Sequence, residues 1–323
     1  MRTPDNSCMV TLADVQAAAE RMRPFVVRTP LERSLALSER RGVDVWFKLE
    51  CFQATGSFKL RGALNALQLL PPPRQVVTAS AGNHGLGVAR AATLLGGTAT
   101  VVVARTASPA KVDALRRSGA ELVQHGETYD DAETEGLRLS RERRIPFISA
   151  YNDPDVVAGG GTVALEILED QPDVRTLVVP IGGGGLIGGI GVAAHGLDTQ
   201  VSVYGVQSVA SPSLHAALKA GAVVPVDVKP SLADGLAGNV ESGTITLDLV
   251  KQHVRDVVLV EEAEIADAIG WLLFNERVVV EGAAAVGVAA LLSGRLEVDA
   301  PVCVVLTGRN VSASVVQRIV AAV

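Results

Sequence analysis

A single lysine near residue 60 has the surroundings of a chemically reactive amine. Lys59 lies in the segment GSFKLRGA at 56–63, which follows an apolar, strand-like run at 45–50. A lysine held in partly apolar surroundings has a lowered pKa and can form a Schiff base with a carbonyl group. The same pattern also fits a basic surface at the start of an amphipathic helix, so this segment needs support from other parts of the chain.

A turn of small residues could bind a carboxylate. The segment SAGNHG at 80–85 follows a strand-like run at 75–79 and opens a helical stretch at 86–95. Small residues between a strand and a helix expose backbone N–H groups at the helix N-terminus, where an anion is stabilised. Asn83 adds a side-chain donor that can reach a ring hydroxyl or phenolate. A tight turn with a helix cap is the alternative interpretation.

A run of four glycines is suited to a phosphate. The segment PIGGGGL at 180–186 lies between a strand-like run at 176–179 and a small-residue helix at 187–195. Consecutive glycines let the backbone wrap around a phosphate with its N–H groups inward. The run is neither a dinucleotide fingerprint in its expected context nor a P-loop. A phosphate cup is favoured over a flexible linker because strand and helix patterns flank it directly.

A reactive lysine, an anion-binding turn and a phosphate cup together indicate pyridoxal-phosphate chemistry. The chain resembles the fold-type II pyridoxal-phosphate enzymes, above all their threonine/serine dehydratase and serine racemase branch. The resemblance runs from about Val10 to Val323 and rests on four motifs: SFKLRGA at 57–63, SAGNH at 80–84, GGGGL at 182–186 and TGRN at 307–310. Such spacing over about 250 residues is hard to obtain by chance.

The resemblance assigns roles to individual residues. Lys59 would bind pyridoxal phosphate as a Schiff base, give way to the substrate amine and then remove the α-proton. The other cofactor-binding residues would be Phe58, Asn83, Gly182, Gly183, Gly184, Gly185, Leu186 and Thr307, and the substrate carboxylate would lie on Ser80, Ala81, Gly82 and His84. Phe58 fits a core position equally well, and His84 equally fits a helix cap or a core histidine.

Thr307 bears on the type of reaction. In many pyridoxal-phosphate enzymes a carboxylate keeps the ring nitrogen protonated and makes the ring a strong electron sink. This family places a neutral hydroxyl or thiol there, and Thr307 matches that position. A hydroxyl does not keep the ring nitrogen protonated, so the carbanion is less delocalised and promptly expels a β-leaving group. The implied reaction is therefore the β-elimination of water from a 3-hydroxy amino acid of the threonine or serine type, an ammonia-lyase reaction that gives a 2-keto acid and ammonia.

Three departures from the family narrow this interpretation. Serine racemases have a proton-donating serine where this chain has Ala81, so racemisation is disfavoured. Metal-binding members carry acidic residues in the neighbourhood of Gln207, so no metal ion is expected. Arg309 stands where many members have a glycine; it would either recognise a polar or anionic group of the substrate or pair with Glu281. Arg309 and the run at 280–283 also resemble hydroxyectoine-utilisation dehydratases.

Other functions stay open. They include a hydroxyectoine-pathway dehydratase, a dehydratase of 3-hydroxyaspartate or phenylserine, an amino-acid racemase and a β-replacement synthase. A catalytically silent pyridoxal-phosphate-binding regulatory module is the alternative of another class, and the presence of both Lys59 and Asn83 argues against it. The sequence after Asn310 leaves no room for the effector-binding domain of biosynthetic threonine dehydratases, so feedback control through such a domain is not expected.

Composition limits the possible partners. The 323 residues are 48% hydrophobic and 20% charged, with a net charge of −6 and few aromatic residues, which argues against a nucleic-acid partner. The cysteines form no C-x-x-C pair, Met1 to Cys8 lacks a hydrophobic signal core, and no apolar run is long enough to span a membrane. We expect a cytoplasmic protein with a small-molecule substrate, and the resemblance implies a homodimer.

Strand-like and helical patterns alternate along the chain. Strands are predicted at 45–49, 76–79, 98–103, 121–124, 146–149, 176–180, 201–206 and 302–306, and helices at 12–22, 85–95, 110–118, 130–143, 156–169, 262–274 and 282–292. Continuous apolar strands between helices predict an α/β fold with doubly wound parallel sheets. The resemblance implies two open-sheet domains of the tryptophan-synthase-β type with the cofactor in the cleft between them. The smaller domain would span 54–148, and the larger would combine 1–53 with 149–323.

Overall fold

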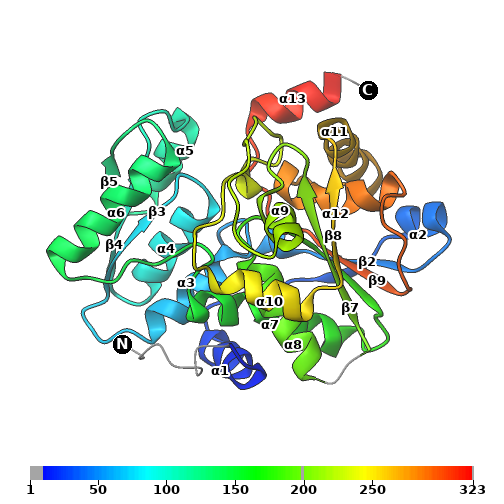
Figure 1. Ribbon diagram of the computed structural model, residues 1–323, viewed down its shortest axis with the longest axis horizontal. Coiled ribbons are helices and arrows are strands. Elements are labelled where there is room, and N and C mark those ends of the chain that lie inside the picture. The colour runs from blue at the N-terminus through cyan, green and yellow to red at the C-terminus, as the bar shows by residue number, and fades with distance from the viewer. Residues whose placement is uncertain (1–9, 198–199, 322–323) are drawn as a thin grey trace.

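The computed structural model describes residues 10–197 and 200–321. The chain folds into two separate sheets, each covered by helices, and the smaller sheet with its helices lies to one side of the larger (Figure 1). The α/β fold predicted from the alternating patterns is confirmed. The predicted absence of a signal core at Met1 to Cys8 concerns residues outside the described ranges.

The larger sheet has the strand order β1-β2-β9-β6-β7-β8. All neighbouring strands in it are parallel except β1, which pairs with β2 in the antiparallel direction. Its strands are β1 (Leu31–Arg33), β2 (Val45–Lys48), β6 (Thr176–Pro180), β7 (Ser202–Ser208), β8 (Asp256–Val260) and β9 (Val302–Val305). Successive side chains of a strand point to opposite faces, so Leu177 and Val179 pack in one core cluster and Val178 in the other.

The smaller sheet is parallel and has the order β3-β4-β5. Its strands are β3 (Gln75–Ala79), β4 (Thr98–Val103) and β5 (Glu121–Gln124). The strand predicted at 146–149 is wrong, because only one bridge forms there, between Val77 and Phe147. Pro146 has no N–H group to extend the ladder, and the Ser149 hydroxyl accepts hydrogen bonds from the next backbone N–H groups and turns the chain away.

Helices connect the strands. They are α1 (Leu12–Met22), α2 (Leu35–Arg41), α3 (Lys59–Gln68), α4 (Asn83–Leu94), α5 (Pro109–Arg117), α6 (Tyr129–Arg143), α7 (Pro154–Asp170), α8 (Gly185–Gly196), α9 (Ser213–Ala220), α10 (Ile245–His253), α11 (Glu262–Trp271), α12 (Gly282–Leu292) and α13 (Ala313–Ala321), with short helical turns η1 (Glu50–Phe52), η2 (Asp234–Leu236) and η3 (Leu272–Glu276). The helices predicted from the sequence are all present. No prediction covered the elements β1, β8, α2, α9, α10 and α13.

The helices α3, α7 and α8 pack against one another at glycines, and this contact positions the lysine segment and the glycine run. A Cβ atom on Gly159 of α7 would lie 2.7 Å from the backbone of Gly62 in α3. A Cβ atom on Gly161 of α7 would lie 2.6 Å from the carbonyl oxygen of Gly189 in α8. The backbones can approach this closely only because no side chain intervenes. As a result α7 fixes the start of α3 relative to the start of α8.

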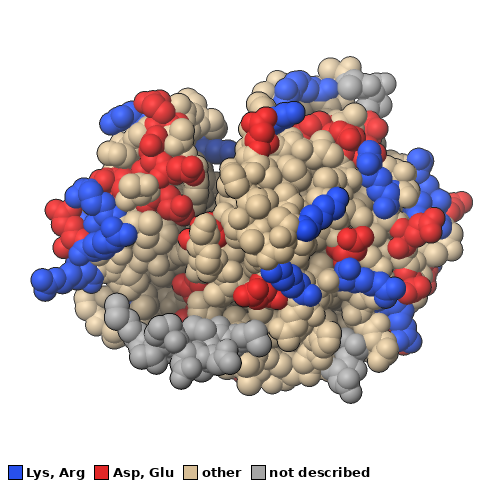
Figure 2. Space-filling model, viewed as in Figure 1, with Lys and Arg blue, Asp and Glu red and all other residues tan. Residues whose placement is uncertain are grey.

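The predicted domain boundaries agree with the distribution of strands but stay a prediction. The range 54–148 contains β3, β4 and β5, and the other strands lie outside it. One exposed ion pair, Lys111 Nζ to Asp234 Oδ2 at 2.7 Å, connects α5 beside the smaller sheet with η2 beside the larger. Figure 2 shows a notch between the two parts, and acidic and basic side chains are interspersed over this face. None of the described helices is long and apolar enough to cross a membrane.

Candidate active site

Lys59 is the first residue of α3, and its amine is held inside the protein. The Nζ atom donates a hydrogen bond of 2.7 Å to the carbonyl oxygen of Ala150 and lies 5.1 Å from the centre of the Phe58 ring. Burial lowers the pKa of Lys59 to about 8, although the nearby Glu281 carboxyl acts in the opposite direction. A lysine in this state is partly neutral near neutral pH, as a nucleophile or a base requires.

The segment before Lys59 is attached to the C-terminal end of β9. The Phe58 N–H group donates to the carbonyl oxygen of Thr307 at 3.0 Å, and Ser57 forms a β-bridge with Gly308. Thr307 is therefore next to Lys59 although almost 250 positions separate them, and its side chain is buried. The Ser57 hydroxyl is buried and has no hydrogen-bond partner among the described residues.

The glycine run forms a tight loop between β6 and α8. Gly184 precedes the helix with φ of 89°, a left-handed conformation that favours glycine. The N–H groups of the first turn of an α-helix have no partner within the helix, so those of α8 are available to an anion. The Thr246 hydroxyl donates to the carbonyl oxygen of Gly183 at 2.6 Å and so fixes the loop from the other side.

Tyr151 supports this loop. A Cβ atom on Gly183 would lie 2.3 Å from Cγ of Tyr151, so the ring is packed directly against the glycine backbone. The Tyr151 hydroxyl accepts a hydrogen bond from the Glu241 N–H group at 3.1 Å. Because the carbonyl that holds Lys59 belongs to Ala150, the preceding residue, one short segment links the lysine to the glycine loop.

The turn at 80–84 presents backbone N–H groups at the start of α4. The Ser80 hydroxyl accepts from the Gly82 N–H group at 3.1 Å, and a Cβ atom on Gly82 would have no neighbour within 4 Å. Open space therefore faces the turn. His84 is buried, its Nε2–H donates to the carbonyl of Ile148 at 3.0 Å, and burial lowers its pKa to about 3. The His84 ring thus lies in the interior in its neutral form.

Asn83 is fixed by two groups from distant parts of the chain. Its Nδ2 donates to Glu281 Oε1 at 2.7 Å, and its Oδ1 accepts from Asn310 Nδ2 at 2.6 Å. The other carboxylate oxygen of Glu281 accepts from the Asn310 N–H group at 3.2 Å. Burial raises the pKa of Glu281 to about 7, so this carboxyl changes its charge near neutral pH. The second N–H of the Asn83 amide can donate a hydrogen bond to the ring oxygen of a bound molecule.

We expect the variant Glu281→Gln to reduce the dependence of stability on pH. The pKa of Glu281 is raised from 4.5 to about 7 by burial, so the folded protein holds a proton that the unfolded chain has released. Between these values the free energy of unfolding falls as pH rises, by up to about 1.4 kcal/mol per pH unit. The glutamine has no proton to lose. Urea unfolding at about pH 5 and about pH 8 would measure this difference.

The control for this measurement is Glu297→Gln, which changes an exposed carboxylate in the same way. This variant should keep the pH dependence of the unaltered protein. A Glu281→Gln protein with an unchanged pH dependence would show that Glu281 is already ionised in the folded state at about pH 5.

We expect Gly183→Ala to weaken cofactor binding by at least about fivefold, since overpacking costs about 1–3 kcal/mol. The added methyl group would lie 2.3–2.6 Å from three ring atoms of Tyr151, so either the ring or the loop must move. The dissociation constant of pyridoxal phosphate, measured by absorbance on the cofactor-free protein, would report the change. Gly270→Ala is the control, because its Cβ atom would lie 3.6 Å from Ile319 in ordinary contact.

A double variant separates the clash from other effects of the methyl group. Combining Gly183→Ala with Tyr151→Ala removes the opposing ring, so the two changes should be strongly non-additive. Additive losses would contradict the role that we assign to the contact between Tyr151 and the loop.

Several residues of the site were not predicted as functional. Ala150, Tyr151 and Thr246 act through contacts that depend on how distant segments pack. Of the two alternatives for Arg309, pairing with Glu281 is wrong: the Arg309 guanidinium lies 5.1 Å from the centre of the Phe52 ring, while Glu281 binds Asn83 and Asn310. Glu281 lies directly before a helix of small residues, and this position is the sequence feature that could have marked it as a functional carboxylate.

For the neighbourhood of Gln207, the sequence predicts no bound metal ion. Gln207 Oε1 accepts from the His215 N–H group at 2.8 Å, while Gln207 Nε2 and the Ser213 hydroxyl are buried without a hydrogen-bond partner among the residues that the structure describes. An amide N–H group is a donor and does not bind a cation. Within residues 10–197 and 200–321, no three side chains of His, Cys, Asp or Glu form a group that could hold a metal ion.

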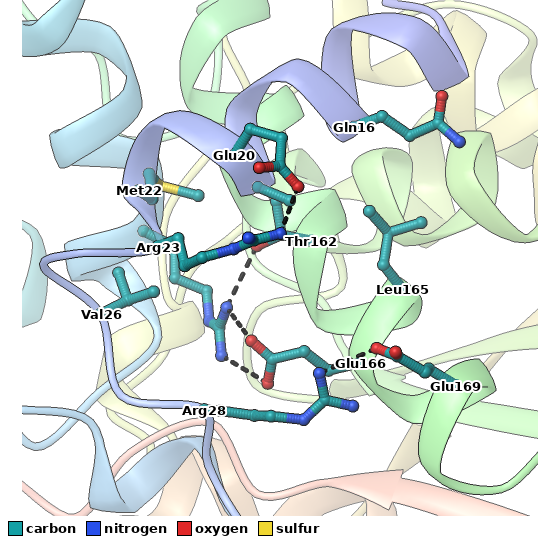
Figure 3. Close-up of a pocket in the computed structure, with 12 residues that line it drawn as sticks. Gln16, Glu20, Met22, Arg23, Val26, Arg28, Thr162, Leu165, Glu166 and Glu169 are labelled. Atoms are coloured by element: carbon teal, nitrogen blue, oxygen red, sulfur yellow. Dashed lines mark hydrogen bonds and ion pairs between the residues drawn. The ribbon is translucent and has the colours of Figure 1, made fainter.

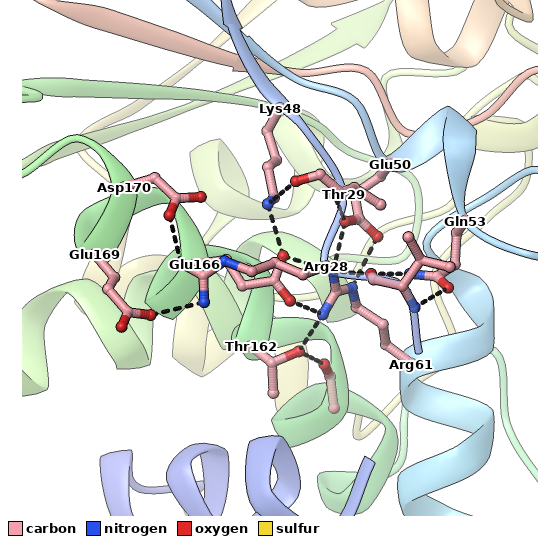
Figure 4. A network of polar contacts seen from close by, with 12 residues as sticks. Arg28, Thr29, Lys48, Glu50, Gln53, Arg61, Thr162, Glu166, Glu169 and Asp170 are labelled. Atoms are coloured by element: carbon pink, nitrogen blue, oxygen red, sulfur yellow. Dashed lines mark hydrogen bonds and ion pairs between the residues drawn. The ribbon is translucent and has the colours of Figure 1, made fainter. Parts of the chain in front are cut away.

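A buried ionic network holds α3 in place (Figure 4). The Arg61 side chain is 1% exposed and binds Glu50 through Nε and Nη2, both at 2.8 Å, and Glu166 at 2.7 and 2.9 Å. Lys48 Nζ binds the same Glu166 carboxylate at 2.6 Å and the carbonyl of Thr29 at 2.7 Å. Charges at full burial are stable only when paired in this way. The network joins β2, η1, α3 and α7.

Proteins of similar sequence match this chain over most of its length. The family model described as "Pyridoxal-phosphate dependent enzyme" matches residues 22–308. The L-threonine ammonia-lyase of Thermotoga maritima is 44% identical over 97% of this chain and 78% of its own length. The catabolic L-threonine dehydratase of Escherichia coli K12 is 37% identical over 96% of both chains.

Solved structures with the same fold span more than one reaction. Maize serine racemase has a TM-score of 0.90 and 30% identity over 97% of both chains. The processed form of threonine deaminase isoform 2 from Solanum lycopersicum has a TM-score of 0.89 and 30% identity over 96% of this chain and 91% of its own. Similarity of fold alone therefore does not select the reaction. The chain belongs to the family of pyridoxal-phosphate dependent enzymes, and pyridoxal phosphate is its cofactor.

Proposed function

We propose that this protein is an ammonia-lyase that removes water from a 3-hydroxy amino acid, with L-threonine as the main substrate. The observation that carries the proposal is the amine of Lys59, which has a pKa of about 8 through burial and is fixed by Ala150 beside the glycine loop. The named ammonia-lyase and dehydratase relatives, at 44% and 37% identity, support the same reaction.

The residues present fit pyridoxal phosphate. A Cβ atom would lie 2.3 Å from Tyr151 Cγ at Gly183 and 3.0 Å from Thr246 Cβ at Gly184, so this loop must be made of glycines and can turn its backbone N–H groups to a phosphate. The buried Ser57 hydroxyl lacks a partner among the described residues. The N–H groups of 182–186 would hold the phosphate, Asn83 the ring oxygen, Phe58 the ring face and Thr307 the ring nitrogen. When bound, the cofactor supplies an electron sink for the α-carbon of the substrate.

The remaining chemistry belongs to the chain. Lys59 anchors the cofactor and then takes the α-proton, for which a pKa of about 8 is suitable. Thr307 offers a neutral hydroxyl, which favours prompt loss of the β-hydroxyl over a long-lived carbanion. Ser80, Ala81 and Gly82 would orient the substrate carboxylate beside the open space at this turn, with the Ala81 N–H group and the Ser80 hydroxyl as donors, since the Ser80 and Gly82 N–H groups already donate to Val102 and to the Ser80 hydroxyl. Ala81 has no proton to deliver to the opposite face, which supports elimination over racemisation.

The proposal extends to the domains and the assembly of the protein. It includes a smaller domain at 54–148 that closes over the substrate against the larger one, a homodimer in solution and a cytoplasmic location. Both described cysteines, Cys51 and Cys303, are buried as free thiols, which supports a reducing compartment. Analytical ultracentrifugation of the cofactor-loaded enzyme tests the homodimer.

The decisive experiment offers the cofactor-loaded enzyme L-threonine, L-serine, both diastereomers of 3-hydroxyaspartate, and 3-phenylserine. Equal amounts of keto acid and ammonia, formed fastest from L-threonine, are the expected result. Removal of the cofactor with hydroxylamine should abolish turnover, and pyridoxal phosphate should restore it while pyridoxal, which lacks the phosphate, should not. No release from any of these compounds by the loaded enzyme would overturn the proposal.

A further inference from the structure

Among the described residues, both buried and exposed ion pairs join the smaller part of the chain, 54–148, to the rest. Arg61 pairs with two carboxylates of the larger part and is buried. Lys111 Nζ binds Asp234 Oδ2 at 2.7 Å, and these two side chains are 43% and 60% exposed. A buried pair is costly to break, whereas water readily replaces the partners of an exposed pair. The first connection is therefore lasting and the second is reversible.

The two connections lie at different ends of the molecule. Arg61 and Arg28 line a cavity of about 640 Å³ between α1 and α7 (Figure 3). Helices α1 and α7 lie in the lower half of Figure 1, whereas α5, which carries Lys111, lies in the upper half. A part that is held firmly at one end and reversibly at the other can turn about the firm end, as in hinge closure around a ligand.

On the Lys111 side, the exposed pair is connected to the turn at 80–84. Val112 and Leu115 of α5 are buried, and Ala81 packs against the cluster that contains them. Lys111 directly precedes Val112 in the same helix. The position of α5 therefore sets the position of the turn that we assign to the substrate carboxylate.

On the other side of the pair, η2 lies beside the site that we assign to the cofactor. A Cβ atom on Gly182 would lie 3.2 Å from Cα of Leu236, and a Cβ atom on Gly235 would lie 3.9 Å from Glu281 Oε1. The same oxygen of Glu281 accepts the hydrogen bond from Asn83. The turn η2 therefore adjoins both the glycine loop and the group that fixes Asn83.

Both ends of the segment that contains η2 are anchored to the larger part. The Glu262 carboxylate accepts hydrogen bonds from the Ser231 hydroxyl and the Leu232 N–H group, both at 2.6 Å. The Gly238 N–H group donates to the Ser211 hydroxyl at 3.0 Å. Since η2 is held at both ends, its first residue presents a carboxylate at a fixed position, toward which the smaller part can close.

We propose that Lys111 and Asp234 are positioning residues that hold the smaller part closed over the bound substrate. Their ion pair would hold the turn at 80–84 close to η2 during the reaction and would open when product leaves. An exposed pair is suited to this task because it contributes little to stability and can be broken in every turnover. The inference rests on the proposed ammonia-lyase reaction and assigns its domain closure to two side chains.

The variant Lys111→Met should raise KM for L-threonine by about two- to fivefold, the range for an exposed ion pair. The turnover number should stay within about twofold, because the groups that act on the substrate are unchanged. The control is Arg116→Met, which breaks the exposed pair of Arg116 with Asp113 within α5 and should leave both constants unchanged. An unchanged KM in Lys111→Met would overturn the proposal.

Exchanging the two charges separates positioning from other effects of the side chains. Lys111→Asp and Asp234→Lys each place like charges opposite one another, so each should raise KM by more than Lys111→Met does. The double variant has the same residue types in exchanged places and should return KM to within about twofold of the unaltered enzyme. A double variant as impaired as the worse single variant would contradict the role of the pair.

A measurement without turnover tests the closure directly. Hydroxylamine must reach the cofactor at Lys59 to release it, and absorbance follows the release. At low salt the release should be about two- to fivefold faster in Lys111→Met than in the unaltered protein. The difference should disappear in about 1 M NaCl, where the Debye length is about 3 Å. Equal rates at low salt would overturn the latch, and this result would be distinct from failure of the proposed ammonia-lyase reaction.

Discussion

Replacing Lys59 by alanine is expected to lower the turnover number with L-threonine by about 10,000-fold or more, since general base catalysis alone contributes about 100- to 10,000-fold. The variant loses both the group that anchors the cofactor and the base that takes the α-proton. The helix should persist, because Lys59 is the first residue of α3 and its only described side-chain hydrogen bond is to Ala150. Release of keto acid at saturating substrate measures the effect.

Added amines separate this chemical role from a structural one. A small primary amine such as methylamine should partly restore turnover of the Lys59→Ala enzyme, and more so as pH rises and the amine loses its proton. Lys229→Ala, which removes an exposed lysine, should retain full activity. A Lys59→Ala enzyme with turnover within about tenfold of the unaltered enzyme would exclude Lys59 as the base.

The parts of the site that could be predicted are those encoded by local sequence. Lys59 after an apolar strand, Asn83 at a turn and the glycines at 182–185 each lie in a short motif with its own physical reason. In parallel sheets, ligand-binding segments lie at the C-terminal ends of the strands. The predicted sheets therefore also predicted that these motifs lie close together. The predicted elements 176–180 and 282–292 were correct because each is a mostly apolar run with turn residues beside it.

The residues that could not be predicted depend on contacts between distant segments. Tyr151 lies in a short loop with no periodic pattern, and its role follows only from the proximity of Gly183. Pairing with Arg309 was one of two alternatives that the sequence left open for Arg309, but in the structure the Glu281 carboxylate fixes Asn83. Sequence also does not distinguish Glu166, which is nearly buried, from the exposed Glu169 one turn later.

The largest loss of stability is expected from a change in the buried network of Arg61, Glu50 and Glu166. Arg61→Met should lower the free energy of unfolding by about 3–5 kcal/mol, because removing one partner of a buried ion pair leaves the other charge unmatched. Glu50 is fully buried and would keep only the Thr29 hydroxyl as a described partner for its side chain. Glu166 would keep Lys48. Equilibrium unfolding in urea measures the change.

The pH dependence of this loss identifies its cause. Burial raises the pKa of the Glu166 carboxyl, and Arg61 beside it lowers that pKa. In the variant only burial and Lys48 act on it, so the folded variant binds a proton there more readily than the unaltered protein does, and the loss of stability should be larger at about pH 8 than at about pH 5. A loss of equal size at both pH values would point to packing and not to charge.

Arg28→Met is the matched control for Arg61→Met, because the same residue types change at an exposed pair beside the same cavity. Arg28 is 50% exposed and binds Glu169 at 2.8 Å and Asp170. Such pairs contribute about 0–1 kcal/mol, so the variant should unfold at nearly the same urea concentration as the unaltered protein. Equal losses for the two variants would show that burial does not set the strength of the Arg61 network. The expected difference follows from solvent, since water compensates the charges left by Arg28 but does not reach the fully buried Glu50 carboxylate left by Arg61.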